Sequence, residues 1–124
     1  MNTKQYQKFT FEDIDAKSSK TFSFQIRTGY TFSTGLFFYS TLSMEKVKVS
    51  VKIDGNEILP VGTDMNLFRW TEGISRSEAL WDFSKERIQC EGKRIEVIIT
   101  NEGATKFRGS LADLYLLLEN EIEE

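Results

Sequence analysis

The clearest pattern in the chain is a strict alternation of apolar and polar residues over positions 46–54. The apolar positions are Val47, Val49, Val51 and Ile53. Because side chains of a β-strand point alternately to its two faces, this segment predicts a strand with one buried face. The next two residues, Gly55 and Asn56, suit the positive-φ positions of a two-residue hairpin turn. Residues 57–59 then form the returning strand, which Pro60 is expected to end.

The same alternation recurs elsewhere along the chain. It is present at Phe9/Phe11, at Phe22/Phe24/Ile26 and at Ile95/Val97/Ile99. A turn at 101–103 leads to a last strand over 111–118. With 10 Phe against 4 Ala, the composition also favours strands, since aromatic side chains suit a half-buried pleated surface. Seven or eight strands joined by short polar turns predict an all-β, single antiparallel β-sandwich, jelly-roll-like in its topology.

The middle of the chain, residues 63–92, leaves two interpretations open. The run from Ser75 to Glu78 has the spacing of a helix capping box, which predicts one short helix over 75–87. Equally, residues 80–83 and 87–90 suit two short strands. Periodicity does not decide between them.

Length and charge indicate one domain over residues 1–118 and an acidic C-terminal tail over 119–124. The last six residues hold four acids and no base, so the remaining 15 acids and 16 bases nearly balance. A near-neutral body argues against nucleic acid as a partner.

No run of apolar residues reaches the roughly 18 residues of a membrane-spanning helix, so no membrane partner is expected. The start has no secretory apolar core, so synthesis in the cytoplasm without a signal peptide is expected.

Missing residue types exclude much chemistry. There is no histidine, which removes histidine bases and histidine-ligated metals. The single cysteine, Cys90, can form neither an intramolecular disulfide nor a paired-cysteine metal site. The eight glycines are scattered singly, without a phosphate-binding motif. We therefore expect no cofactor, no metal and no catalytic residue. Carboxylates at Asp64, Glu72, Glu78 and Asp82 are the candidates for a glycosidase pair, but some proximity is expected by chance in a chain with 19 acids, and we expect most of them to be solvated.

Two predicted strands are apolar on both faces, at 36–39 and 114–118. An open antiparallel sheet normally gives one face to water, so such strands need a second cover. One interpretation is cover by the 63–92 segment or the N-terminal arm of the same chain. The other is burial in a subunit interface, because large exposed apolar patches are uncommon on monomers. The candidate interface residues are Leu36, Phe37, Phe38, Tyr39, Tyr115 and Leu117.

Two tryptophans suggest a different kind of site. Exposed indoles beside charged side chains could stack on sugar rings and bind their hydroxyls. The candidate sugar platform is Trp70, Trp81, Arg69 and Glu72. The alternative is that both indoles pack in the core or at its rim, as large aromatics usually do.

The order of strands and turns resembles small jelly-roll and related β-sandwich structural proteins of bacteriophage and other virus particles. The resemblance is carried by the strand, turn and strand of residues 47–60 and by the strand at 94–101, with 114–118 as a closing strand. It implies a self-associating building block, such as a minor coat, spike-base or head-fibre module, with no chemistry of its own.

The leading interpretation is therefore a non-enzymatic structural protein of a virus particle. Its partners would be further copies of itself, as a trimer or larger homo-oligomer, and other particle proteins. The alternative is a carbohydrate-binding module using the tryptophans, with a glycan as partner. A third is an accessory domain that binds a protein through an exposed sheet edge.

Overall fold

The computed structural model describes residues 2–40, 46–65, 69–70, 80–83, 85 and 87–121. The elements of the described residues are β-strands and the 3-10 turn η2 (Gly109–Leu111). The seven long strands are β1 (Asn2–Thr10), β2 (Ser18–Gln25), β3 (Phe32–Ser40), β4 (Val47–Ile53), β5 (Asn56–Asp64), β9 (Arg94–Asn101) and β10 (Ala112–Glu121). The two-residue strands are β6 (Arg69–Trp70), β7 (Trp81–Asp82) and β8 (Ile88–Gln89).

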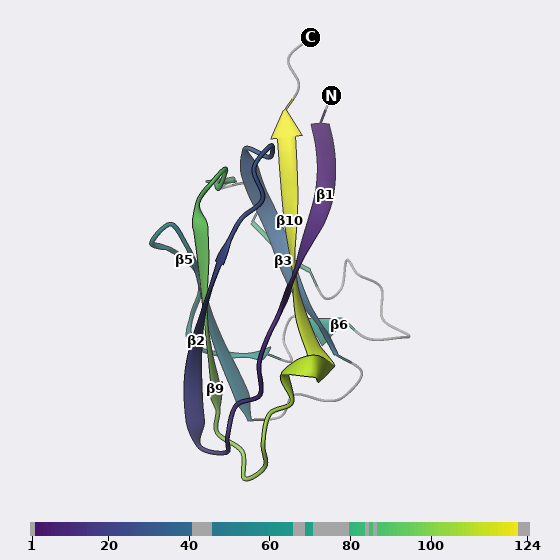
Figure 1. Cartoon of the computed structure of the whole chain (residues 1–124). Coiled ribbons are helices and arrows are strands. Elements are labelled where there is room, and N and C mark those ends of the chain that lie inside the picture. The colour runs from purple at the N-terminus through teal and green to yellow at the C-terminus, as the bar shows by residue number, and fades with distance from the viewer. Residues whose placement is uncertain are drawn as a thin grey trace.

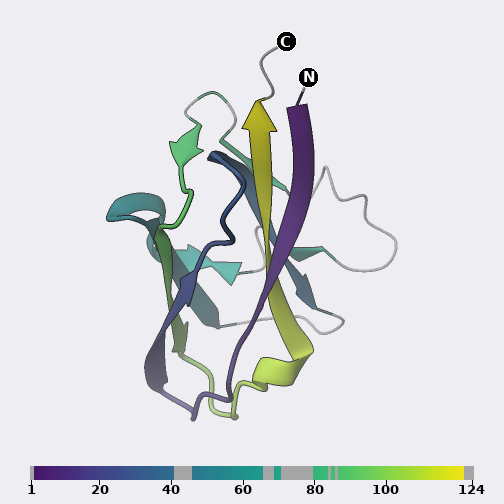
Figure 2. The same ribbon diagram turned by 45° about the horizontal axis from the view of Figure 1, so that its top comes forward.

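The strands form two sheets that pack face to face (Figures 1 and 2). One has the order β1-β10-β3, with β6, β7 and β8 along the far edge of β3. The other has the order β2-β9-β4-β5. All long strands pair antiparallel, and only the short β6 runs parallel to its neighbour. The predicted antiparallel β-sandwich is confirmed.

The chain passes repeatedly from one sheet to the other. Strands β1, β3 and β10 belong to one sheet, whereas β2, β4, β5 and β9 belong to the other. Only β4 and β5 are consecutive long strands that pair as a hairpin. The first and last strands are neighbours, with Asn2 opposite Glu121, so both termini lie at one end of the sandwich (Figure 1).

The core lies between the sheets and is built from the apolar positions of the alternating segments. Each of the four predicted inward residues of β4 is buried, and so are the alternate residues of β9 and β10. These inward residues are Val47, Val49, Val51, Ile53, Ile95, Val97, Ile99, Leu114, Leu116 and Leu118. Leu36 and Phe38 of β3 also belong to this core, which removes both from the candidate subunit interface.

The side of the sandwich where β1 faces β2 is closed by side chains. Rings from the two sheets meet there, with centroids 4.9 Å apart for Phe9 and Phe24 and 5.1 Å apart for Phe11 and Phe22. Farther along, the Gln7 amide acts as a peptide group would: its Oε1 accepts from the Arg27 N–H at 2.8 Å, and its Nε2 donates to a backbone carbonyl at 3.3 Å. This side chain thereby continues the hydrogen bonding of β2 beyond its end.

Two details of the predicted hairpin were wrong. The turn residues are Asp54 and Gly55, with φ of 49° and 81°, and Asn56 already pairs with Ile53. Aspartate tolerates the left-handed conformation that the turn requires, so the turn lies one residue earlier. Pro60 does not end the strand, because β5 is an edge strand and a bulge absorbs the proline within it.

Two further predictions meet the structure in part. Within 75–87, the described residues contain the strand β7 rather than a helix, and β8 follows at 88–89. Residues 71–79, which include the predicted capping box, lie outside the described residues.

The last strand is longer than predicted. It continues to Glu121 because Glu119, Asn120 and Glu121 pair with β1, so the first half of the predicted tail is part of the sheet.

Candidate functional site

The outer face of the β1-β10-β3 sheet carries a group of aromatic side chains. Tyr6, Phe37 and Tyr115 come from three adjacent strands. Phe37 stacks on Tyr115, with ring centroids 5.1 Å apart and planes 12° apart. Tyr6 meets Phe37 edge-on at 5.4 Å and Tyr115 at 6.4 Å. Offset stacks and edge-to-face contacts suit the charge distribution of aromatic rings, so the three rings form a stable cluster.

The same chain covers part of this cluster. Phe37 is 2% exposed although it lies outside the core between the sheets. Tyr6 covers it from the N-terminal strand. On the same face a Cβ at Gly35 would lie 2.9 Å from Leu80 Cδ1, so the missing side chain makes room for Leu80. Both intrachain covers considered from the sequence, the N-terminal arm and the 63–92 segment, therefore contribute.

Around the cluster the cover is incomplete. Tyr6, Tyr39, Tyr115 and Leu117 all remain half-buried. We call Tyr6, Phe37, Tyr39, Tyr115 and Leu117 the aromatic face. Of the six predicted interface residues, the structure thus brings together Phe37, Tyr39, Tyr115 and Leu117 on one surface. Tyr6 was missed, because the Gln-Tyr-Gln-Lys context around it has no apolar alternation.

Charged residues border the aromatic face. Lys8 Nζ lies 3.8 Å from Asp113 Oδ2, with the two side chains 52% and 19% exposed. Farther along the same two strands, Lys4 is registered opposite Glu119. Asp82, registered opposite Gly35 of β3, lies on the same side of the sheet.

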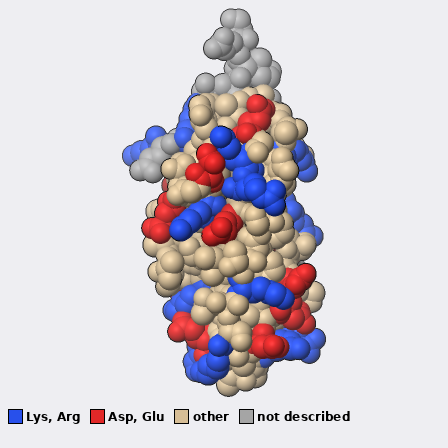
Figure 3. All heavy atoms as spheres, turned by 60° about the vertical axis from the view of Figure 1, so that its left-hand side comes forward, with Lys and Arg blue, Asp and Glu red and all other residues tan. Residues whose placement is uncertain are grey.

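The opposite outer face, on the β2-β9-β4-β5 sheet, is different in kind. Lysine, arginine and acidic side chains intermingle over it (Figure 3). Lys48 pairs with Asp64 at 3.8 Å, and Lys52 is registered opposite Glu96. Such cross-strand charge pairs are typical of a solvated sheet face. Ile98 is its half-buried apolar residue on the central strand β9.

A shallow depression at one end of that face is occupied by its own charges. Its lining includes Ser23, Asp54, Lys93 and Arg94. Lys93 Nζ lies 3.5 Å from an Asp54 carboxylate oxygen, and Arg94 Nε donates to Ser23 Oγ at 3.1 Å. These four side chains therefore contact one another in pairs within the depression.

The predicted sugar platform is only partly described. Trp81 lies in β7 and is 39% exposed. The backbone of Arg69 and Trp70 forms β6, while Glu72 lies outside the described residues. Strands β6 and β7 pair with different parts of β3, at 38–39 and 35–36 respectively. The platform stays a prediction.

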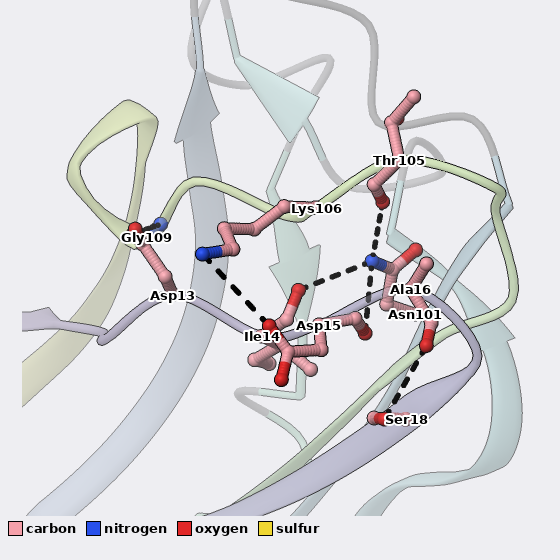
Figure 4. A network of polar contacts seen from close by, with 9 residues as sticks. All are labelled: Asp13, Ile14, Asp15, Ala16, Ser18, Asn101, Thr105, Lys106 and Gly109. Atoms are coloured by element: carbon pink, nitrogen blue, oxygen red, sulfur yellow. Dashed lines mark hydrogen bonds and ion pairs between the residues drawn. The ribbon is translucent and has the colours of Figure 1, made fainter.

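A buried polar clasp joins the two loops at the other end of the sandwich (Figure 4). Asn101, 3% exposed, accepts from the Gly103 N–H through Oδ1 at 3.0 Å. This bond fixes the orientation of the amide, whose Nδ2 faces the carbonyl oxygens of Ile14, Asp15 and Thr105 at 3.2, 3.3 and 2.8 Å. One side chain thus ties the β1–β2 connection to the β9–β10 connection.

Neighbouring contacts extend the clasp. The backbones of Ile14 and Phe107 exchange two hydrogen bonds, at 2.9 and 2.8 Å. Asp13 Oδ1 accepts from the Gly109 N–H at 3.0 Å (Figure 4). A Cβ at Gly109 would lie 2.3 Å from the Phe11 carbonyl oxygen, so the loops approach too closely for any side chain there. Every group of the clasp is satisfied within the chain, so we assign it a structural role.

Cys90 is a buried thiol. Burial, and secondarily the negative charge of Glu91, raises its pKa from 9.0 to about 11. Only the thiolate is nucleophilic, so this cysteine is unsuited to catalysis. Cys90 belongs to the core between the sheets.

The raised pKa makes the Cys90 thiol a reporter of unfolding. At pH 8 we expect native protein to react with a thiol-specific disulfide reagent about 100-fold more slowly than protein unfolded in guanidinium, from the thiolate fraction alone. Because folding disfavours the thiolate, this group also lowers the free energy of unfolding as pH rises from 9 toward 11. Stoichiometric labelling of the native protein at the unfolded rate would contradict the burial.

Comparisons with known proteins place the chain in no family. No protein-family model, no curated protein and no solved structure matches it. Among the described residues there is no group of three metal-ligating side chains, and no helix there is long and apolar enough to cross a membrane.

Proposed function

We propose that this protein is a non-enzymatic structural module, a component of a virus particle, that associates with further copies of itself through the aromatic face. The observation that carries the proposal is the contrast between the two outer faces of the sandwich. One is covered with paired charges, and the other holds four half-buried apolar or phenolic side chains around a buried ring.

The residues of the aromatic face are of the type that contact surfaces use. Tyrosine is enriched in the centres of protein interfaces, where its ring is buried while its hydroxyl finds a polar partner. Burying such a face contributes about 25 cal/mol per Å² of apolar area, before the costs of association are subtracted. No comparable apolar face is present on the β2-β9-β4-β5 sheet, as far as its residues are described.

Two of the four sheet edges are poorly suited to association. The edge strand β5 contains Pro60 and a bulge, two devices that block pairing with another strand. The edge of β3 is occupied by three separate two-residue strands. At these two edges the arrangement disfavours the strand addition of an accessory interaction domain.

Strand order supports the resemblance to particle proteins. When the short parallel strand β6 is left out and β7 and β8 are counted as one interrupted strand, the described residues form eight strands. Their order is 1-8-3-6 in one sheet and 2-7-4-5 in the other. This is the order of a jelly roll, an architecture used by many viral capsid domains and also by lectins.

The proposal is tested by substituting one residue on each outer face. Leu117→Lys places an ammonium in the proposed contact, whereas Ile98→Lys makes the matched change on the central strand of the charged face. An unpaired charge buried in a contact costs at least about 3 kcal/mol, which corresponds to roughly 100-fold weaker association. We expect the wild type and Ile98→Lys to form the same oligomer, and Leu117→Lys to be a folded monomer.

The measurement is light scattering coupled to size exclusion over a wide concentration range, with circular dichroism to verify folding. A wild-type protein that stays monomeric at the highest concentration would overturn the proposal. So would an oligomer that Ile98→Lys disrupts and Leu117→Lys does not, since association would then use the charged face.

A further inference from the structure

We infer that Asp54–Gly55, the turn of the β4–β5 hairpin, is a site of covalent self-modification by aspartate isomerisation, and that the closed turn prevents the reaction until the hairpin opens. This chemistry is independent of the proposed self-association. Three features of the described residues lead to it: the sequence of the turn, its access to water and its backbone conformation.

The sequence of the turn favours ring closure. In aspartate isomerisation the backbone nitrogen of the following residue attacks the carboxyl carbon Cγ. The new C–N bond forms as the carboxyl hydroxyl leaves, and this hydroxyl departs with the N–H proton as one water molecule. A side chain on the following residue hinders the attack, and glycine has none. Asp54 is the one aspartate in the chain that glycine follows, and no asparagine precedes a glycine.

Water completes the reaction by opening the cyclic imide at one of its two carbonyl carbons. Opening at Cγ restores aspartate, whereas opening at the backbone carbonyl leaves the main chain running through Cβ and Cγ, which is isoaspartate. One water is lost and one is gained, so the mass of the protein does not change. Asp54 and Gly55 both line the shallow depression on the charged face, and the Asp54 side chain is 52% exposed, so water reaches the turn.

The conformation of the closed turn keeps the reacting atoms apart. Positive φ at both central residues, 49° at Asp54 and 81° at Gly55, indicates a type I′ turn. As the mirror image of type I, this turn has a ψ of about +30° at its first central residue. At that ψ the Cα–Cβ bond of Asp54 is nearly anti to the Gly55 nitrogen, whereas the ring requires them to be nearly eclipsed. Cγ therefore reaches the nitrogen only after a rotation of about 150° in ψ.

That rotation is incompatible with the closed hairpin. It would redirect the chain after Asp54, although Asn56 pairs with Ile53 across the turn. Two further contacts hold Asp54 on the sheet: its N–H donates to the Arg94 carbonyl oxygen at 3.1 Å, and a carboxylate oxygen lies 3.5 Å from Lys93 Nζ. A reaction that requires a locally open state proceeds in proportion to the population of that state. Isomerisation of the native protein therefore measures how often this hairpin opens.

The experiment compares native protein with protein unfolded in guanidinium chloride, both incubated at the same temperature and neutral pH. Trypsin then releases residues 53–69, which contain Asp54 and also Asp64, an aspartate followed by methionine. Liquid chromatography separates isoaspartate forms of equal mass, and electron-transfer fragmentation locates them. We expect isoaspartate to form at Asp54 in the unfolded protein, at least about tenfold more slowly in the native protein, and far more slowly at Asp64 in both.

Two variants separate the causes. Asp54→Glu lengthens the side chain by one carbon, which disfavours the ring, so no isomerisation is expected at this position even after unfolding. Lys93→Ala removes the ion pair and keeps the turn. Because an ion pair between half-exposed side chains contributes little, its native rate is expected to stay within about threefold of wild type. Thermal melts verify that both variants are folded, and the comparison of native with unfolded wild type stands without them.

Equal rates in native and unfolded wild type would overturn the inference, because the closed turn would then give no protection. Absence of isoaspartate at Asp54 after unfolding would overturn it as well. A native Lys93→Ala protein that isomerises as fast as unfolded protein would show that the ion pair protects Asp54, in place of the turn conformation, and would likewise count against the inference.

Discussion

Replacing Asn101 by aspartate is expected to lower the free energy of unfolding by about 3–5 kcal/mol at pH 7, the cost of an uncompensated buried charge. The substitution keeps the size of the side chain and the bond from Gly103 N–H to Oδ1. It replaces the Nδ2 donor by a second oxygen facing three carbonyl oxygens, at the present distances of 2.8 to 3.3 Å. Repulsion between these oxygens adds to the loss of the hydrogen bonds, so the clasp between the two loops would open.

The Asn101→Asp variant should also acquire a further pH dependence, because the wild-type amide does not titrate. A protonated carboxyl can donate to one of the three carbonyls, so the folded state binds the proton more tightly than the unfolded state, and its pKa is raised. The variant is therefore closest to wild type below about pH 4, the unfolded pKa of aspartate, and the difference widens as pH rises.

Urea unfolding at several pH values measures this difference. The control is Asn120→Asp, because the Oδ1 of Asn120 accepts a hydrogen bond from the Thr31 hydroxyl at 2.8 Å and an aspartate keeps that acceptor. The control is expected to stay within about 0.5 kcal/mol of wild type. Equal, small effects at both positions would contradict the clasp.

Replacing Gly109 by alanine is expected to destabilise the fold by about 3 kcal/mol and to lower Tm by about 10 °C. The added Cβ would lie 2.3 Å from the Phe11 carbonyl oxygen and 2.6 Å from the Glu12 backbone. These are backbone atoms that a change of rotamer cannot move, so one loop must shift. That shift also stretches the bond from Gly109 N–H to Asp13.

Gly103→Ala is the matched control for Gly109→Ala, since it lies in the same clasp. Its Cβ would meet Asn101 Oδ1 at 3.2 Å, a contact that a small adjustment relieves. Differential scanning calorimetry of both variants should give a Tm loss at Gly103 less than half of that at Gly109. A Gly109→Ala protein as stable as wild type would show that the two loops do not approach as described.

The sequence predicted those strands in which the residue types and the alternation of apolar and polar positions both indicated a β-strand. In β4 the inward positions are β-branched and the outward ones are mostly lysine. The strand and the identity of its buried face could therefore be predicted together. The exception was Pro60, which is compatible with a strand only at an edge. Whether a strand lies at an edge depends on which strands pair, and the pairing of distant segments cannot be predicted from the local alternation of apolar and polar residues.

The candidate site could be predicted only in part for the same reason. A strand with apolar residues on both faces, such as 36–39, does not reveal which face meets the core; the structure assigns Leu36 and Phe38 to the core and Phe37 to the outer face. The burial of Asn101 could have been predicted from its position, but residues 101–103 were assigned to a turn instead. It continues the inward series of Ile95, Val97 and Ile99, and a polar side chain at an inward position needs buried hydrogen-bond partners.

The adjacency of the first and last strands has a mechanical consequence. Because Asn2 and Glu121 face each other at the same end of an antiparallel ladder, a force pulling these residues apart acts along the hydrogen bonds, perpendicular to the strands. The ladder then opens like a zipper, one pair at a time, and never bears the load on all its bonds together. Tension entering through this end would peel β1 from β10 at low force, whereas tension entering through the β4–β5 turn would meet the sheets in a different direction.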